Sequence, residues 1–310
     1  MPWNPFARRL RVETAALGKH PLFPDFIEWR GDTGGGLLRE LKPICHECMF
    51  PEFTSGKLDP TAPPNLIFAA WSPKYFHLAR VMASRDSAGR NLIPFMCAVR
   101  GPSNPINYWF TSILPQLDRN AELMMTRTNP EELEAHWQAF STQLDCTWDR
   151  LIEQERLTKT RANTLEEACH EDYWRDRRFA SGLYRILTWL PTQQSVIERR
   201  HSEGGELLLL PMVTDSAARS TYFWLLFLSH ILPPHVTITA VANRTHKRIS
   251  VVSGFFPKRL FERLHEPTEH GAFYHELPHF EPSGAFLGLL QQVRDKLKLG
   301  QLPTLAQLQM

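Results

Sequence analysis

The sequence has few cysteines, little excess of charge of either sign and no long hydrophobic run. Its five cysteines are an odd number scattered over 310 residues, which favours free thiols in a reducing compartment over a disulfide framework. The formal net charge is only +2, so composition gives no reason to expect binding to nucleic acid or to an anionic membrane. We therefore expect that electrostatic attraction alone does not select the partners of this protein.

The longest apolar block, Tyr222 to Leu232, is interrupted by Ser229 and His230. It is much shorter than the ~20 residues that cross a bilayer, and we expect a core helix there instead. No apolar run of the kind found in signal peptides follows the basic residues near the start of the sequence. The expectation is a cytoplasmic protein without direct membrane insertion.

Apolar runs separated by turn-forming residues indicate strands in both halves of the sequence. Hydrophobic residues make up 43% of the chain, enough for a substantial core. The runs predict strands at Leu66–Trp71, Leu92–Val99, Leu207–Leu210, Val236–Val241 and Arg248–Val252. We expect the first two strands to be neighbours and the last two to form a hairpin.

The middle of the sequence is predicted to be helical. Asn129 and Pro130 are typical of a helix start, and apolar residues then recur at spacings of three and four up to Leu151. A second capping box at Thr164 opens another helical stretch that ends at Pro191. Further helices are expected over 216–232, after Pro257, and from Phe286.

These elements predict an α/β (α+β) fold with a mostly antiparallel central sheet, helices packed on it and a longer helical middle segment. Strands occur at both ends of the sequence, so one sheet built from both halves is favoured over two separate domains. We expect residues 1–310 to form one domain, with an N-terminal half at 12–110, a helical segment at 129–190 and a C-terminal half at 205–300.

His275-Glu276-Leu277-Pro278-His279 matches the H-E-x-x-H pattern of zinc hydrolases. That pattern needs a continuous helix so that both histidines share one face. Pro278 lacks the N–H and moves Leu277 out of the helical region of conformation. We expect a polar surface loop, and keep a metal-dependent hydrolase that uses His275, Glu276 and His279 as the alternative function.

Two further motifs have the residues but not the context of a reactive site. Cys45 and Cys48 form a C-x-x-C between prolines, and a second cysteine pair to complete a zinc site is missing. We expect a half-buried structural pair. The glycines at 34–36 precede an apparent helix, but the Gly-Lys-Ser/Thr ending of a phosphate loop is absent. No cofactor is expected.

In the first 100 residues, the segments Gly18 to Ile27 and Ser84 to Arg90 resemble two motifs of the TagF (also called ImpM) family of bacterial type VI secretion accessory proteins. Gly18 to Ile27 (GKHPLFPDFI) is similar to the family signature in which G-K-x-P is followed by Asp-Phe. Ser84 to Arg90 (SRDSAGR) is similar to its S-x-D-x-x-G-R motif. The residues that carry the resemblance are Gly18, Lys19, Pro21, Asp25, Phe26, Ser84, Asp86, Gly89 and Arg90.

The resemblance implies a non-enzymatic cytoplasmic regulator of type VI secretion, acting after translation by binding a forkhead-associated scaffold component. From the residues alone, Gly18 and Gly89 suit turns with positive φ. The planar guanidinium of Arg90 can donate two hydrogen bonds to a carboxylate such as that of Asp25. We expect Asp25 and Arg90 to be partly buried and paired with each other. A structural role for the two motifs and a partner-binding role both remain open at this point.

Overall fold

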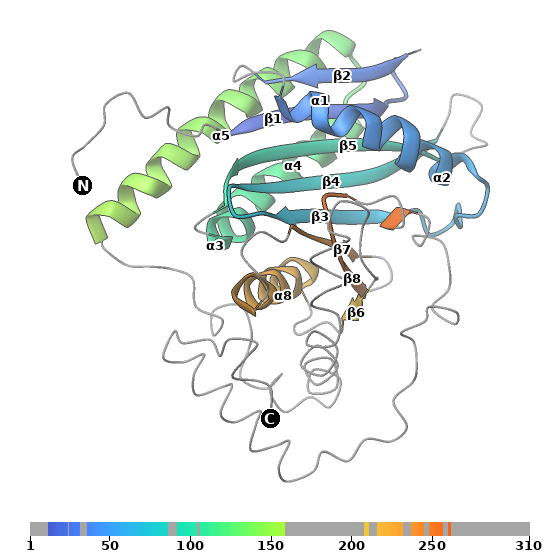
Figure 1. Ribbon diagram of the computed structural model, residues 1–310. Helices are drawn as coiled ribbons and strands as arrows, with labels where there is room; N and C mark the ends of the chain where they lie inside the picture. Colours follow the sequence, from blue (N-terminus) through green and yellow to red (C-terminus); the bar gives the residue numbers. More distant parts are fainter. Residues whose placement is uncertain are drawn as a thin grey trace, which may run out of the picture.

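One antiparallel sheet organises the part of the chain that the structure describes. The computed structural model describes residues 12–23, 25–31, 36–85, 92–103, 106–158, 208–210, 216–231, 237–244, 248–256 and 260–261. Eight strands run in the order β2-β1-β5-β4-β3-β7-β8-β6, and neighbours are antiparallel throughout (Figure 1). The strands are β1 (Glu13–Lys19), β2 (Phe26–Arg30), β3 (Asn65–Trp71), β4 (Tyr75–Arg85), β5 (Leu92–Pro102), β6 (Leu208–Leu210), β7 (Ile238–Asn243) and β8 (Arg248–Ser253). The expected fold class is confirmed.

Helices cover both faces of this sheet. In Figure 1, α1 and α2 lie in front of the strands, whereas α4 and α5 lie behind them. The front layer consists of α1 (Gly36–Pro43), the π-helical η1 (Ile44–Met49) and α2 (Phe50–Thr54). The other helices are α3 (Ile106–Tyr108), the π-helical η2 (Trp109–Ile113), α4 (Leu114–Thr126), α5 (Pro130–Thr158) and α8 (Ala217–Ile231). Each layer buries its own hydrophobic cluster against the sheet.

The two clusters follow from side-chain alternation along the strands. In β4, Phe76 and Leu78 belong to the cluster beneath α3, α4, α5 and α8, whereas Ala79 and Val81 belong to the one beneath α1 and α2. Successive side chains of a strand point to opposite faces. Because both faces are covered, the central strands are apolar on both sides and read as nearly continuous hydrophobic runs.

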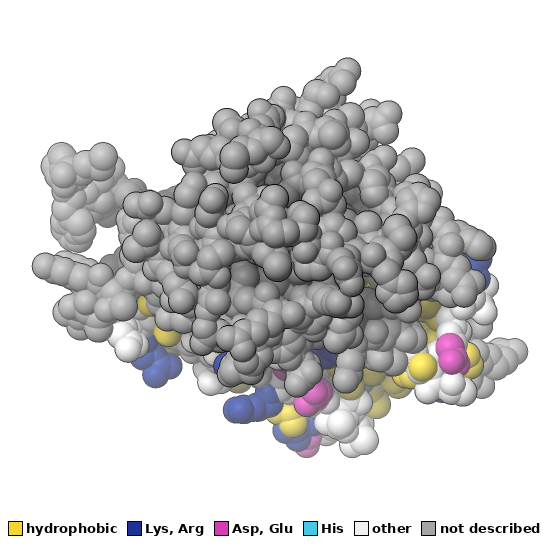
Figure 2. Space-filling view, turned by 90° about the horizontal axis from the view of Figure 1, so that it is seen from below, with side chains coloured by type: hydrophobic (Ala, Val, Ile, Leu, Met, Phe, Trp, Pro, Cys, Tyr) yellow, Lys and Arg dark blue, Asp and Glu magenta, His cyan; other side chains and the backbone are white. Residues whose placement is uncertain are grey.

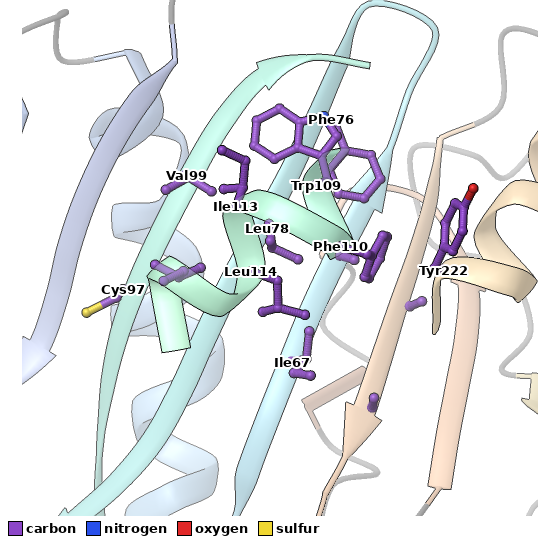
Figure 3. Close-up of a cluster of buried hydrophobic side chains, with 14 of the residues drawn as sticks. Ile67, Phe76, Leu78, Cys97, Val99, Trp109, Phe110, Ile113, Leu114 and Tyr222 are labelled. Atoms are coloured by element: carbon purple, nitrogen blue, oxygen red, sulfur yellow. The ribbon is translucent and has the colours of Figure 1, made fainter. Parts of the chain in front are cut away.

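Aromatic rings form the centre of the larger cluster (Figure 3). Trp109 stacks on Phe76 with ring centroids 5.3 Å apart, and Phe110 meets the same ring edge-on at 5.7 Å. Tyr222 of α8 lies 5.6 Å from Phe110, which joins a helix from the second half of the chain to strands and helices of the first half. Figure 3 shows these rings converging from η2, β4 and α8.

The expected pairing of the first two apolar strands is wrong, because β4 lies between β3 and β5. A tight turn follows Trp71, in which the Ser72 N–H and hydroxyl both donate to the Tyr75 carbonyl at 2.9 Å. This turn sends Tyr75–Arg85 back along β3. The strand was missed because His77 and Arg80 interrupt its apolar pattern, although both side chains are buried.

Helix α5 and the C-terminal hairpin agree with expectation. The Asn129 side chain accepts hydrogen bonds from the N–H groups of Glu131 (2.9 Å) and Glu132 (3.4 Å), so it caps the helix as predicted. Strands β7 and β8 pair in antiparallel register, and β7 pairs with β3, so both halves share the sheet. The helices predicted from Thr164 and Phe286 lie outside the described residues. Over the described part of the chain, no helix combines the length and apolar character that a bilayer span requires.

Candidate functional site

The two segments that resemble the TagF family lie at the same end of the sheet. Strand β1 ends at Lys19 and β4 ends at Arg85, while β5 begins there at Leu92. Because β5 is antiparallel to both strands, the ends of β1 and β4 come together. The Ser84 hydroxyl donates to the Lys19 carbonyl at 3.3 Å, so the first and second segments are in direct contact.

Gly18 is required by a close approach between β1 and β5. Its φ is +113°, and a Cβ atom there would lie 2.3 Å from the Pro94 carbonyl oxygen. Any other L-residue would be strained in that conformation and would collide with backbone. The positive φ was expected, but in a turn; it occurs within β1, opposite Ile27 and Phe95.

Lys19 and His20 hold the segment that follows β1. The Lys19 ammonium donates to the Phe23 carbonyl at 2.8 Å. His20 is buried, its Nε2 donates to the Met124 carbonyl at 2.9 Å, and its Nδ1 accepts the Leu22 N–H at 3.2 Å. Burial lowers the pKa of His20, although the Met124 bond opposes the shift. The Lys19 ammonium and both ring nitrogens of His20 are therefore engaged with backbone groups of the loop and of α4.

The remaining motif residues are exposed, half-buried or outside the described part of the chain. Asp25 is exposed, so the expectation of a partly buried aspartate is wrong. Phe26 is half-buried between His46 (4.6 Å between ring centroids) and Phe50 (5.0 Å). Pro21 is exposed. Asp86, Gly89 and Arg90 lie outside the described residues, so the proposed Asp25–Arg90 pair is untested.

The C-x-x-C motif lies within η1, in a continuous helical stretch from α1 to α2. It therefore does not open a helix after a strand, as a redox motif would. Cys45 is buried, and burial together with the Glu28 charge raises the pKa of its thiol to about 12. Cys48 is half-buried. A neutral Cys45 thiol is unsuited to thiolate chemistry and packs as a small hydrophobe.

The start of α1, considered above as a phosphate loop, is occupied by an internal carboxylate. The Leu37 N–H donates to Oε2 of Glu13 at 2.9 Å. A Cβ at Gly36 would lie 2.5 Å from an Arg100 guanidinium nitrogen. The helix start therefore has its anion already, from β1, and the glycine makes room for the arginine that neutralises it.

Arg100 connects α1 to the sheet through a cluster of charges that sequence reasoning did not find. Its guanidinium donates to Glu13 at 2.7 Å and also to Glu40 of α1. His77 Nε2 lies 3.4 Å from the same Glu40 carboxylate, and the Arg100 guanidinium lies 4.9 Å from the Tyr75 ring centre. Glu13, Arg100 and His77 are successive cross-strand partners on β1, β5 and β4.

The charge states of this cluster follow from burial and pairing. Burial lowers the pKa of His77, which outweighs the opposing effect of Glu40. For Arg100, burial acts to lower the pKa, but the two carboxylates raise it overall. For Glu40, burial acts to raise the pKa, and the bonds to His77 and Arg100 lower it overall. The cluster thus pairs one arginine with two carboxylates beside a neutral imidazole.

The pH dependence of stability is a consequence of these shifts. His20 and His77 have folded pKa values below their ordinary values, so the unfolded chain binds protons more readily. The two neutral histidines contribute fully to stability above the unfolded pKa of about 6.5. This contribution is lost as the pH falls toward their lower pKa values in the folded state. We expect the free energy of unfolding in urea to fall from pH 7.5 to 5.5, and less steeply in a His20→Gln variant. An identical pH profile for that variant and the parent would contradict this assignment.

No metal site is found in the part of the chain that the structure describes, where no group of three or more His, Cys, Asp or Glu side chains is placed to hold an ion. His275, Glu276 and His279 lie outside that part, so the alternative hydrolase motif is untested. No family model matches the sequence, and no curated protein matches it.

Proposed function

We propose that this chain is a non-enzymatic accessory protein of bacterial type VI secretion, which acts in the cytoplasm by binding another protein. The proposal starts from the resemblance of residues 18–27 and 84–90 to the TagF family. The observation that supports it most is the hydrogen bond between Ser84 and Lys19. This bond joins the described start of the second segment to the first segment across 65 residues of sequence, which supports a binding surface that the two segments share.

The chemistry of that sheet end suits binding better than catalysis. Lys19 and both ring nitrogens of His20 are engaged with backbone groups, so neither acts as a base for a neighbouring nucleophile. Asp25 is exposed, and next to it the half-buried Phe26 ring packs with Phe50. An aromatic side chain beside a charged rim is the composition typical of protein-binding hot spots.

The described side chains that are visible from below (Figure 2) include charges of both signs. Figure 2 shows basic, acidic and hydrophobic side chains intermixed along the border of the face seen from below. The net charge of +2 over the whole sequence agrees with this mixture. A protein partner recognised by shape and a few anchors, such as the forkhead-associated scaffold component implied by the resemblance, fits such a surface better than nucleic acid does.

Binding to that scaffold component tests the proposal. We expect Asp25→Ala and Phe26→Ala to weaken binding in calorimetric titration by about tenfold or more, as loss of an interface anchor does. Asp25 is exposed, so its replacement should leave the thermal melt unchanged. Asp149→Ala, which changes an exposed aspartate of α5, is the matched control and should bind like the parent.

Further measurements on the same protein distinguish the proposed function from the alternative one. If the parent chain does not bind the scaffold component, or if both variants bind as tightly as the parent, this binding surface is wrong. If the purified protein instead contains stoichiometric zinc, and a hydrolytic activity that is lost in Glu276→Gln, the metal-dependent hydrolase replaces the accessory protein.

A further inference from the structure

Strand β2 is the terminal strand of the described sheet, and one of its edges is not paired with another described strand. The Gly31 N–H donates to the Thr14 carbonyl at 3.0 Å, so Gly31 directs its backbone groups toward β1. Backbone direction alternates along an antiparallel strand. Ile27 and Trp29 therefore also face β1, whereas Phe26, Glu28 and Arg30 direct their N–H and C=O groups to the outer edge.

The charged side chains of β2 are complementary to those of β2 in a second copy of the chain. In a two-fold antiparallel pair centred on Trp29, Glu28 of each copy lies opposite Arg30 of the other. Both residues have outward backbone groups, so the same register forms backbone hydrogen bonds and two opposite-charge pairs. Shifting the centre to Glu28 or to Arg30 places like charges opposite each other, which is destabilising.

The surroundings of β2 favour this register as well. The Glu28 carboxylate accepts from Lys42 at 2.7 Å and lies 3.2 Å from His46 Nε2, and a carboxylate has lone pairs for a further guanidinium donor. Arg30 is exposed. On the opposite face Trp29 is half-buried against Phe23, with ring centroids 5.5 Å apart, so the two Trp29 side chains would meet at the dimer axis.

We propose that two copies of this chain associate through their β2 edges in that register and form one continuous sheet. The proposal goes beyond the proposed secretion function and does not depend on it. A five-residue edge buries much less than the ~1,200–2,000 Å² of a stable interface, so the dimer is weak and depends on protein concentration. Its charge pairs act twice because the interface is isologous.

Sedimentation velocity of the full chain, from low micromolar to several hundred micromolar concentration, measures this association. We expect Arg30→Glu to raise the dimer dissociation constant at least about tenfold, since two attractive pairs become repulsive. Arg30→Pro should act similarly, because it removes an outward N–H and leaves the ladder with β1 intact. Arg119→Glu makes the same charge change at an exposed position of α4 and should dimerise like the parent.

Cross-linking tests the register. In a Cys146→Ser background, which removes an exposed thiol, Trp29→Cys should give a covalent dimer under mild oxidation, because the two positions face each other across the axis. Glu28→Cys should cross-link much less. A parent chain that stays monomeric at every concentration, a dimer insensitive to Arg30→Glu, or cross-linking at position 28 in preference to 29 would each overturn the proposal. Binding of a partner's strand to this edge with no self-association would overturn it as well.

Discussion

Trp137→Ala is expected to lower the free energy of unfolding by about 3–5 kcal/mol, and Phe140→Ala by a similar amount. Trp137 is completely buried and Phe140 is 6% exposed, and their rings lie 5.6 Å apart. Both belong to the large hydrophobic cluster. Removing either ring would leave a cavity between α5 and the sheet that the surroundings only partly fill.

The attachment of α5 to the sheet explains why such a cavity would not close easily. The Ser141 and Thr14 hydroxyl oxygens are 2.7 Å apart, which ties α5 to β1. A Cβ at Gly31 would lie 2.0 Å from the Ser141 hydroxyl oxygen and 2.1 Å from that of Thr14. The helix therefore rests directly on the backbone next to β2, through a residue that follows Trp137 by about one turn.

Equilibrium unfolding in urea measures this loss of stability. Glu134→Ala on the exposed side of the same helix is the control and should change the free energy by less than about 0.5 kcal/mol. Parent-like stability of both core variants would mean that α5 contributes little to the fold, and would make its apolar face a candidate binding surface instead.

The fold could be predicted wherever the signal for an element lies in residues that are close together in the sequence. Continuous apolar runs identified β3, β5, β7 and β8, and the Asn129 cap identified the start of α5, because these patterns depend on neighbouring residues. Strand β4 escaped prediction since His77 and Arg80 break its apolar run. Their burial is stabilised by Glu40 and by Asp118, which lie far away in the sequence and give no local signal.

The same limit applies to the candidate site. The two motif segments could be found from their residues, but their contact depends on the order of β1, β5 and β4. Arg100 meets Glu13 across 87 residues and Glu40 across 60, so no spacing rule reveals that cluster. The mistaken environment of Asp25 has a similar cause: the apolar residues beside it suggested burial, whereas the loop directs its side chain outward.

The second buried arginine offers the sharpest test of how distant charges support this sheet. Arg80 of β4 is 1% exposed, and it donates to the Leu66 carbonyl at 2.6 Å and to the Asn65 side chain at 2.7 Å. Its Nε lies 2.5 Å from one oxygen of Asp118 in α4, whose other oxygen lies 2.5 Å from Arg244. Asp118 thus separates two guanidinium groups.

Asp118→Ala should lower the free energy of unfolding by about 3–5 kcal/mol, because it leaves Arg80 as an uncompensated buried charge that faces Arg244. Burial and the Arg244 charge both lower the pKa of Arg80, and Asp118 opposes them. Arg80→Met should cost less, since it removes the buried charge and leaves Asp118 paired with Arg244 at a partly exposed position. Comparing the two variants therefore distinguishes the loss of the ion pair from the effect of leaving one buried charge without its partner.

The double variant Arg80→Met/Asp118→Ala completes the cycle. Because the aspartate is no longer needed once the buried arginine is gone, its loss of stability should be smaller than the sum of the single losses by at least about 1 kcal/mol. Arg119→Ala, one residue along α4 and exposed, should be nearly neutral in the same urea unfolding experiment. Additivity within about 0.5 kcal/mol would show that Arg80 and Asp118 do not depend on each other, and the hydrogen bonds from Arg80 to β3 would then be sufficient to hold its charge in the core.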